Sequence, residues 1–239
     1  MDTVTACRKL SDARSRGIMS VKLNFRGEST LYPGIADIIA HARRMGFIDI
    51  MLNSNLQVGL KKLRSILDAG LTTLIVSVDS FDRATYCKLH GCTAPDYYRL
   101  IDNLEYLRGL RRQNKLKCRV KLNFHINKYN QNENWDYYEN EFSMFPAIKK
   151  YTMPREGQNI SIGKKPKKRK RVCPHMMRRE LMTAIGKIYP CCMAYNEPAD
   201  IDITYHPDEL RELLIENYKE KKYKKTCENC TSGDIWKNR

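Results

Sequence analysis

The residues best suited to chemistry are five cysteines near the C-terminus. They are Cys173, the adjacent pair Cys191 and Cys192, and the pair Cys227 and Cys230, which two residues separate. A Cys-x-x-Cys pair brings two thiolates within reach of one metal centre, and thiolates from distant loops can complete four soft ligands. The pattern predicts a zinc ion or an iron–sulfur cluster, and spacing alone does not separate the two.

The other four cysteines, Cys7, Cys87, Cys92 and Cys118, are scattered along the chain and are more typical of packed residues. The sequence opens without a signal-peptide pattern and has no apolar run long enough to span a bilayer. We therefore expect a cytoplasmic protein without membrane association. In a reducing compartment, clustered thiols are more often metal ligands or catalytic groups than disulfides.

The elements that must position such groups alternate along the first two-thirds of the chain. Short apolar runs rich in β-branched residues predict strands at residues 18–25, 47–52, 72–78 and 116–126. Helical spacing of apolar residues predicts helices at residues 3–16, 34–45, 60–69, 82–89, 97–111 and 132–142. Repeated strand–helix units imply an α/β fold with a parallel sheet, either a barrel or an open doubly wound sheet.

In both architectures, functional groups gather where the parallel strands end. The predicted ends are Arg26-Gly27-Glu28, Asn53-Ser54-Asn55, Ser77-Val78-Asp79-Ser80 and the segment that begins at His125. A lone histidine on a strand is more often packed than catalytic, so we give His125 no role.

A run of basic residues at 164–171 separates the two parts of the chain, which carries a formal net charge of +16. Its lack of apolar periodicity is typical of a solvated linker, although it could also contact nucleic-acid phosphates. We expect an α/β domain at residues 1–162, a basic linker at 163–172 and a small cysteine-rich domain at 173–239. A domain this small depends on its metal, because it buries little core by itself.

Two sets of motifs resemble one family, the radical S-adenosylmethionine (radical SAM) superfamily. Residues 26–33, Arg-Gly-Glu-Ser-Thr-Leu-Tyr-Pro, are similar to its Gly-Gly-Glu-Pro-Leu-x-x-Pro segment. Asn53-Ser54-Asn55 falls where the family has a Thr-Asn pair, and Ser77-Val78-Asp79-Ser80 falls where its fourth strand ends. After Cys173, residues 186–192 resemble the Gly-x-Val-x-Pro-Cys-Cys segment of the auxiliary SPASM or twitch extension, which a Cys-x-x-Cys closes.

The resemblance implies a partial radical SAM (β/α) barrel, followed by a SPASM/twitch-like domain. It implies that S-adenosylmethionine contacts Gly27, Glu28, Asn53, Asn55, Ser77 and Asp79. It also implies that Cys173, Cys191, Cys192, Cys227 and Cys230 supply the ligands of one auxiliary 4Fe-4S cluster. The expected activity is radical modification of a peptide or another polar small-molecule substrate, an oxidoreductase type of chemistry.

Departures from the family pattern leave the activity open. The family's Cys-x-x-x-Cys-x-x-Cys motif is absent from this sequence, in which Arg26, Thr30 and Ile185 also replace residues of the family motifs. The first strand of the barrel would then be missing, and an upstream segment or a separate subunit would supply the catalytic cluster. Glu28 could instead be a carboxylate at a helix N-terminus, and Asn53 and Asn55 could be turn residues. The alternative function is a non-enzymatic, metal-stapled module that binds nucleic acid.

Overall fold

The computed structural model describes residues 1–24, 27–151, 181–183, 188–189, 212 and 216. The chain divides into two compact units, one of residues 2–163 and one of Met1 with residues 164–239. The five C-terminal cysteines and the basic run at 164–171 lie outside the described residues, so the predictions made on them stay predictions.

The first unit alternates helices and strands. Its helices are α1 (Thr3–Ser15), α2 (Ile35–Arg44), α3 (Leu60–Asp68), α4 (Arg83–His90), α5 (Ala94–Arg112) and α6 (Asp136–Glu141), with a 3-10 helix η1 at Ser29–Leu31. Its strands are β1 (Ser20–Lys22), β2 (Asp49–Ser54), β3 (Thr73–Ser77), β4 (Arg119–Ile126) and β5 (Ala147–Tyr151). In the second unit, β6 (Leu181–Met182) pairs antiparallel with β7 (Ile188–Tyr189).

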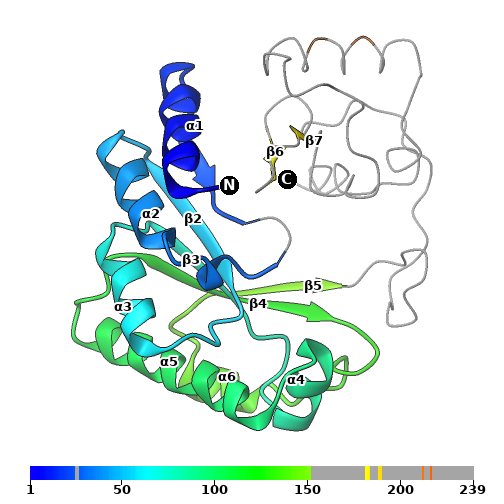
Figure 1. Ribbon diagram of the computed structural model, residues 1–239. Helices are drawn as coiled ribbons and strands as arrows, with labels where there is room; N and C mark the ends of the chain where they lie inside the picture. The colour runs from blue at the N-terminus through cyan, green and yellow to red at the C-terminus, as the bar shows by residue number, and fades with distance from the viewer. Residues whose placement is uncertain (25–26, 152–180, 184–187, 190–211, 213–215, 217–239) are drawn as a thin grey trace. The chain divides into compact units, whose positions relative to one another are not determined.

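The five strands of the first unit form one parallel sheet in the order β1-β2-β3-β4-β5. Parallel neighbours joined by right-handed crossovers place the intervening helices on the same side of the sheet. Figure 1 shows α2, α3 and α5 along that side. The predicted α/β class with a parallel sheet is confirmed.

The predicted strands begin too early. The stretch predicted at 18–25 forms a strand only at Ser20–Lys22, and the one predicted at 116–126 begins at Arg119. Ile18 and Leu116 are partly buried against the core outside the ladder, so burial rather than strand pairing explains their apolar character.

Strand β5 and the start of α5 were not predicted. Strand β5 contains two lysines, and this weakens its strand signal. Helix α5 begins three residues early because Thr93 and Asp96 form a capping box, with a proline in the first turn.

The two faces of the sheet differ in composition. In β4, Val120, Leu122, Phe124 and Ile126 are buried in the core, and the alternate residues point to the opposite face. The same alternation holds in β2, where Ile50 and Leu52 join the core. We call the face opposite the core the polar face; its charged and amide residues include Lys22, Asp49, Asn53, Arg119, Lys121, Asn123 and His125.

None of the helices in the described ranges is both long and apolar enough to pass through a membrane.

Candidate functional site

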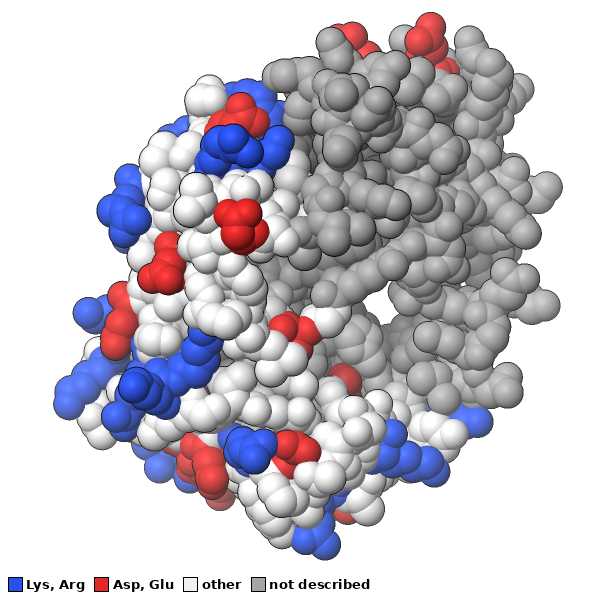
Figure 2. Space-filling view, viewed as in Figure 1, with Lys and Arg blue, Asp and Glu red and all other residues white. Residues whose placement is uncertain are grey.

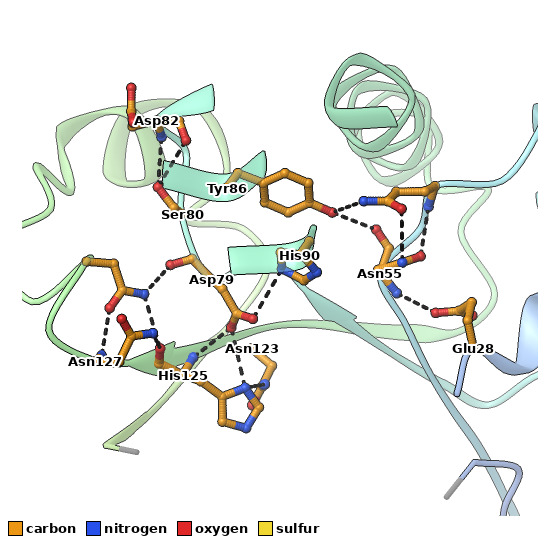
Figure 3. Close-up of polar contacts among 12 residues, drawn as sticks. Glu28, Asn55, Asp79, Ser80, Asp82, Tyr86, His90, Asn123, His125 and Asn127 are labelled. Atoms are coloured by element: carbon orange, nitrogen blue, oxygen red, sulfur yellow. Dashed lines mark hydrogen bonds and ion pairs between the residues drawn. The ribbon is translucent and has the colours of Figure 1, made fainter. Parts of the chain in front are cut away.

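Four loops meet at the carboxyl edge of the sheet, where the predicted site residues lie. The register pairs Ser54 with Val76 and Ser77 with Asn123, so β2 and β3 end within one residue of each other, and β4 continues three residues further, to Ile126. Figure 3 shows Glu28, Asn55 and Asp79 at this edge, linked through side chains of α4.

Glu28 ties the loop after β1 to the loop after β2. Its Oε1 accepts hydrogen bonds from the Thr30 backbone N–H at 3.0 Å and the Thr30 hydroxyl at 2.6 Å. Its Oε2 accepts one from the Asn55 backbone N–H at 2.8 Å. Glu28 therefore caps η1, as the alternative interpretation held, and also joins two of the loops in which the site residues lie.

The preceding residue, Gly27, is exposed and has φ +77°. This left-handed backbone conformation suits glycine because it carries no Cβ.

Asn55 begins a chain of contacts that leads to helix α4. Its side-chain amide donates to Gln57 Oε1 at 3.1 Å and its Oδ1 accepts from the Gln57 backbone N–H at 3.2 Å, which is the predicted turn chemistry. Gln57 Nε2 donates to the Tyr86 hydroxyl at 2.9 Å. The Tyr86 ring stacks on His90 with centroids 4.2 Å apart. Burial raises the pKa of Tyr86, so its hydroxyl keeps its proton.

Asp79 ends this chain of contacts and links two histidines (Figure 3). Its Oδ1 accepts from the His125 backbone N–H at 2.7 Å and lies 3.4 Å from His125 Nδ1. Its Oδ2 lies 3.2 Å from His90 Nε2, although that contact lacks the direction of a hydrogen bond. Asp79 also has φ +58°, a conformation that aspartate adopts more readily than most residues.

The environment of Asp79 keeps its carboxyl ionised. Burial by itself would raise its pKa, but the contacts from the His125 and His90 side chains and from the His125 backbone N–H lower it. The net effect holds the pKa of Asp79 well below its ordinary value. The carboxyl edge therefore carries a half-buried negative charge.

His125 is not packed, contrary to our expectation. Half of its side chain is exposed (50%) at the carboxyl end of β4. Its Nδ1 lies 3.2 Å from Asn123 Nδ2, and Asp79 fixes its backbone. The expectation failed because His125 lies on the polar face, a placement that its alternation with the buried Phe124 and Ile126 could have indicated.

Asn53 and Ser77 lie at the same edge but outside this chain of contacts. Asn53 Oδ1 is buried, and none of the described residues donates a hydrogen bond to it. Ser77 is the last residue of β3 and is half-buried. The structure thus links Glu28, Asn55 and Asp79 through contacts, and places Asn53 and Ser77 beside them without direct contact.

Sequence reasoning did not identify three polar residues that shape this edge. The side-chain amide of Asn130 donates to the backbone carbonyl of Asp79 at 2.6 Å. Glu133 accepts hydrogen bonds from the Ser80 hydroxyl and from the backbone N–H groups of Phe81 and Asp82. Asn123 is buried beside His125. Glu133 lies more than fifty residues from its partners in the sequence, so no local sequence pattern indicates these hydrogen bonds.

Of the described cysteines, Cys92 lies near Gln57 and Tyr86, and Cys87 lies near Tyr86. Cys7, Cys87 and Cys92 are half-buried, and Cys118 is buried, where desolvation raises its pKa to about 11. Within the ranges that the structure covers, no cluster of three or more His, Cys, Asp and Glu side chains could hold a metal ion.

Comparison with known proteins identifies relatives of part of this chain. No protein-family model matches the chain. The chain is 33% identical over 91 residues to a PqqA peptide cyclase of Methylorubrum extorquens, covering 38% of this chain and 23% of that protein. It is 29% identical over 151 residues to a probable GTP 3',8-cyclase of Pyrococcus horikoshii, covering 62% of this chain and 46% of that protein.

A third relative is the S-adenosylmethionine-dependent nucleotide dehydratase of Selenomonas ruminantium, 30% identical over 126 residues, which cover 52% of this chain and 46% of the relative. The chain therefore spans less than half the length of each of these relatives.

The fold and the site define an α/β protein whose polar groups gather at the carboxyl edge of a parallel sheet. The three relatives are radical SAM family members, and the similarity to them supports the predicted resemblance of this chain to the radical SAM superfamily.

Proposed function

We propose that this chain binds S-adenosylmethionine at the carboxyl edge of its sheet and takes part in the radical modification of a polar substrate. The observation that carries the proposal is the set of acceptors that meet there from three strand ends: Glu28, Asn53 and Asp79. The two carboxylates are held by backbone N–H groups, and Asn53 has a buried oxygen without a donor.

These acceptors fit the chemistry of S-adenosylmethionine. The molecule carries a positive sulfonium, an amine and ribose hydroxyls, all of which favour negative or accepting groups. Glu28, with the backbone at Gly27, would receive the amine, and Asn53, Asn55, Ser77 and Asp79 would hold the ribose and carboxylate ends. Together with a reduced iron–sulfur cluster, the bound molecule supplies a radical that removes a hydrogen atom from the substrate.

The proposal extends to the type of barrel, to the C-terminal cysteines and to the source of the catalytic cluster. The strand order, which follows the chain without reversal, supports a partial (β/α) barrel. We propose that the five C-terminal cysteines hold an auxiliary iron–sulfur cluster in a SPASM/twitch-like domain, and that the cluster needed for cleavage comes from a further segment or subunit. The relatives' names include both peptides and nucleotides, so either class is a candidate substrate.

The test is a calorimetric titration of the full chain, purified without oxygen, with S-adenosylmethionine. We expect saturable binding, weakened about tenfold or more in Asp79→Asn, because tenfold corresponds to about 1.4 kcal/mol and one charged contact is worth that much. Asp82→Asn is the matched control, since it removes the same charge three residues away and asparagine still caps α4. Absence of binding by the unaltered chain, or equal affinities of the two variants, would contradict the proposal.

A further inference from the structure

The polar face of the sheet continues from the carboxyl edge toward the amino ends of the strands, where its charged side chains pair with one another. Near the amino ends of the strands, Arg119 Nη2 lies 3.4 Å from Asp49 Oδ1 and 3.2 Å from the Thr73 hydroxyl. Asp49 also accepts hydrogen bonds from the hydroxyls of Thr72 and Thr73. This part of the face is therefore internally satisfied.

The next row of the face contains a lysine whose charge is not balanced. Lys121 on β4 lies opposite Ile75, which lies opposite Asn53 on β2. Lys121 is half-buried, and within the described part of the chain no carboxylate pairs with it. A half-buried ammonium attracts an anion more strongly than a solvated one, because less water screens it.

Three amide oxygens around this row also lack donors. They belong to Asn24, Asn53 and Asn123, and each oxygen is buried without a hydrogen-bond partner among the residues that the structure describes. Asn123 is almost fully buried, at 1% exposure. An unsatisfied buried acceptor costs about 1–3 kcal/mol, so three of them near one face indicate that a ligand supplies the missing donors.

The geometry of the sheet sets the distances between these groups. Parallel strands lie about 4.8 Å apart and rise about 3.3 Å per residue, so Lys121 is about 10 Å from Asn53 across the sheet and about 13 Å from His125 along β4. A ligand of nucleotide size would span these distances.

We propose that Lys121 binds the anionic group, a phosphate or a carboxylate, of a small substrate whose hydrogen-bond donors reach the amides of Asn24 and Asn123. The inference rests on the proposed function, because it places the substrate on the face that leads to the S-adenosylmethionine site. It narrows the substrate to a small acidic molecule.

Other lysines near β4 are not half-buried as Lys121 is. Lys115 and Lys117 precede β4 and are exposed. On the face that Figure 2 shows, the basic side chains of the described residues are interrupted by acidic and uncharged ones. A comparison between Lys121 and one of these solvated lysines therefore separates a specific contact from general attraction to a chain of net charge +16.

The experiment titrates the full chain, by calorimetry at fixed ionic strength, with GTP, inorganic triphosphate, citrate and uncharged guanosine. Lys121→Gln is compared with Lys115→Gln, which has the same net charge. We expect Lys121→Gln to weaken binding of the anions about tenfold or more, and Lys115→Gln to change it less than about twofold. Both variants should unfold at the same temperature as the unaltered chain, because neither lysine has a described ion-pair partner.

The anions tested distinguish the two sources of negative charge. Binding of triphosphate and GTP above citrate identifies a phosphate ligand, and binding of citrate above triphosphate identifies a carboxylate ligand; either supports the proposal when it depends on Lys121. Absence of anion binding, or equal affinities of the two variants, overturns it.

S-adenosylmethionine, titrated into the same samples, tests the proposed function separately. If it binds while the anions do not, the substrate subsite fails and the proposed function stands. If the anions bind through Lys121 while S-adenosylmethionine does not bind, the proposed function fails and the anion site stands.

Discussion

The two faces of the parallel sheet are built from alternate residues of the same strands and serve different purposes. The face toward the helices carries residues such as Leu52, Val76 and Leu122, which are fully buried and contact one another in a single core. The polar face carries Asn53, Ser77 and Lys121 at the neighbouring positions. Neighbouring residues in one strand are therefore under different physical constraints.

The two faces differ in how completely their side chains are packed or hydrogen-bonded. The helix-covered face is closely packed, and burial of apolar area contributes most of the stability of such a unit. The polar face leaves amide oxygens without donors, which lowers stability and is retained in proteins chiefly where a ligand binds. Substitutions on the two faces should therefore have different effects on unfolding.

The largest effect is expected on the core face. Leu122→Ala should reduce the free energy of unfolding by about 3 kcal/mol, because it removes a fully buried side chain and leaves a cavity. Denaturant titration followed by circular dichroism measures this. Leu31→Ala is the control, since Leu31 is 76% exposed and its loss should change stability by less than about 0.5 kcal/mol. Equal effects would mean that the helix-covered face is not the core.

A smaller effect is expected at the carboxyl edge, from Asp79. Asp79→Ala should lower the free energy of unfolding by about 2 kcal/mol at pH 7, because it removes an ionised acceptor and places alanine at a positive φ. Asp79→Asn should lower it less, since asparagine tolerates that conformation and keeps an acceptor. Equal losses in the two variants would show that neither the backbone conformation nor the retained acceptor matters.

The sign of the pH dependence follows from the lowered pKa of Asp79. A carboxyl whose pKa is lower in the folded state contributes its stabilisation fully above its unfolded pKa of about 4, and loses it as the pH falls toward the folded value. The difference in stability between the unaltered chain and Asp79→Asn should therefore shrink below about pH 4. A difference that grew on acidification would contradict this assignment.

The smallest effect is expected on the polar face, from Asn53→Ala. Because the Asn53 Oδ1 atom is buried without a donor, its removal should change the free energy of unfolding by less than about 0.5 kcal/mol or increase it. Asn103→Ala provides the contrast. Asn103 is buried and its amide donates to the carbonyls of Leu56 and Val58, so its loss should cost about 2 kcal/mol. If the two asparagine variants lose equal stability, the polar face is not a binding surface built at the expense of stability.

Prediction from the sequence worked best for the elements with strong local signals. The helices that begin at Thr3, Ile35 and Leu60 match the predicted ranges closely, because their apolar spacing and end signals are local. Strand β5 was missed because pairing with β4, and not its own composition, makes it a strand. Of the site residues, the strand ends indicated Glu28, Asn55 and Asp79, while the contributions of Glu133 and Asn130 depend on partners far away in the sequence.

The sequence by itself determined the alternation of strands and helices, the α/β class, the approximate positions of the strand ends, within about three residues, and the family resemblance, because these depend on residues close together in the chain. Only the tertiary structure decided which polar groups have hydrogen-bond partners. Glu28 uses both carboxylate oxygens in capping and loop contacts, whereas Asn53 keeps an acceptor without a donor. Hydrogen bonds depend on distances of about 3 Å and on direction, and the packing of distant strands and loops sets both.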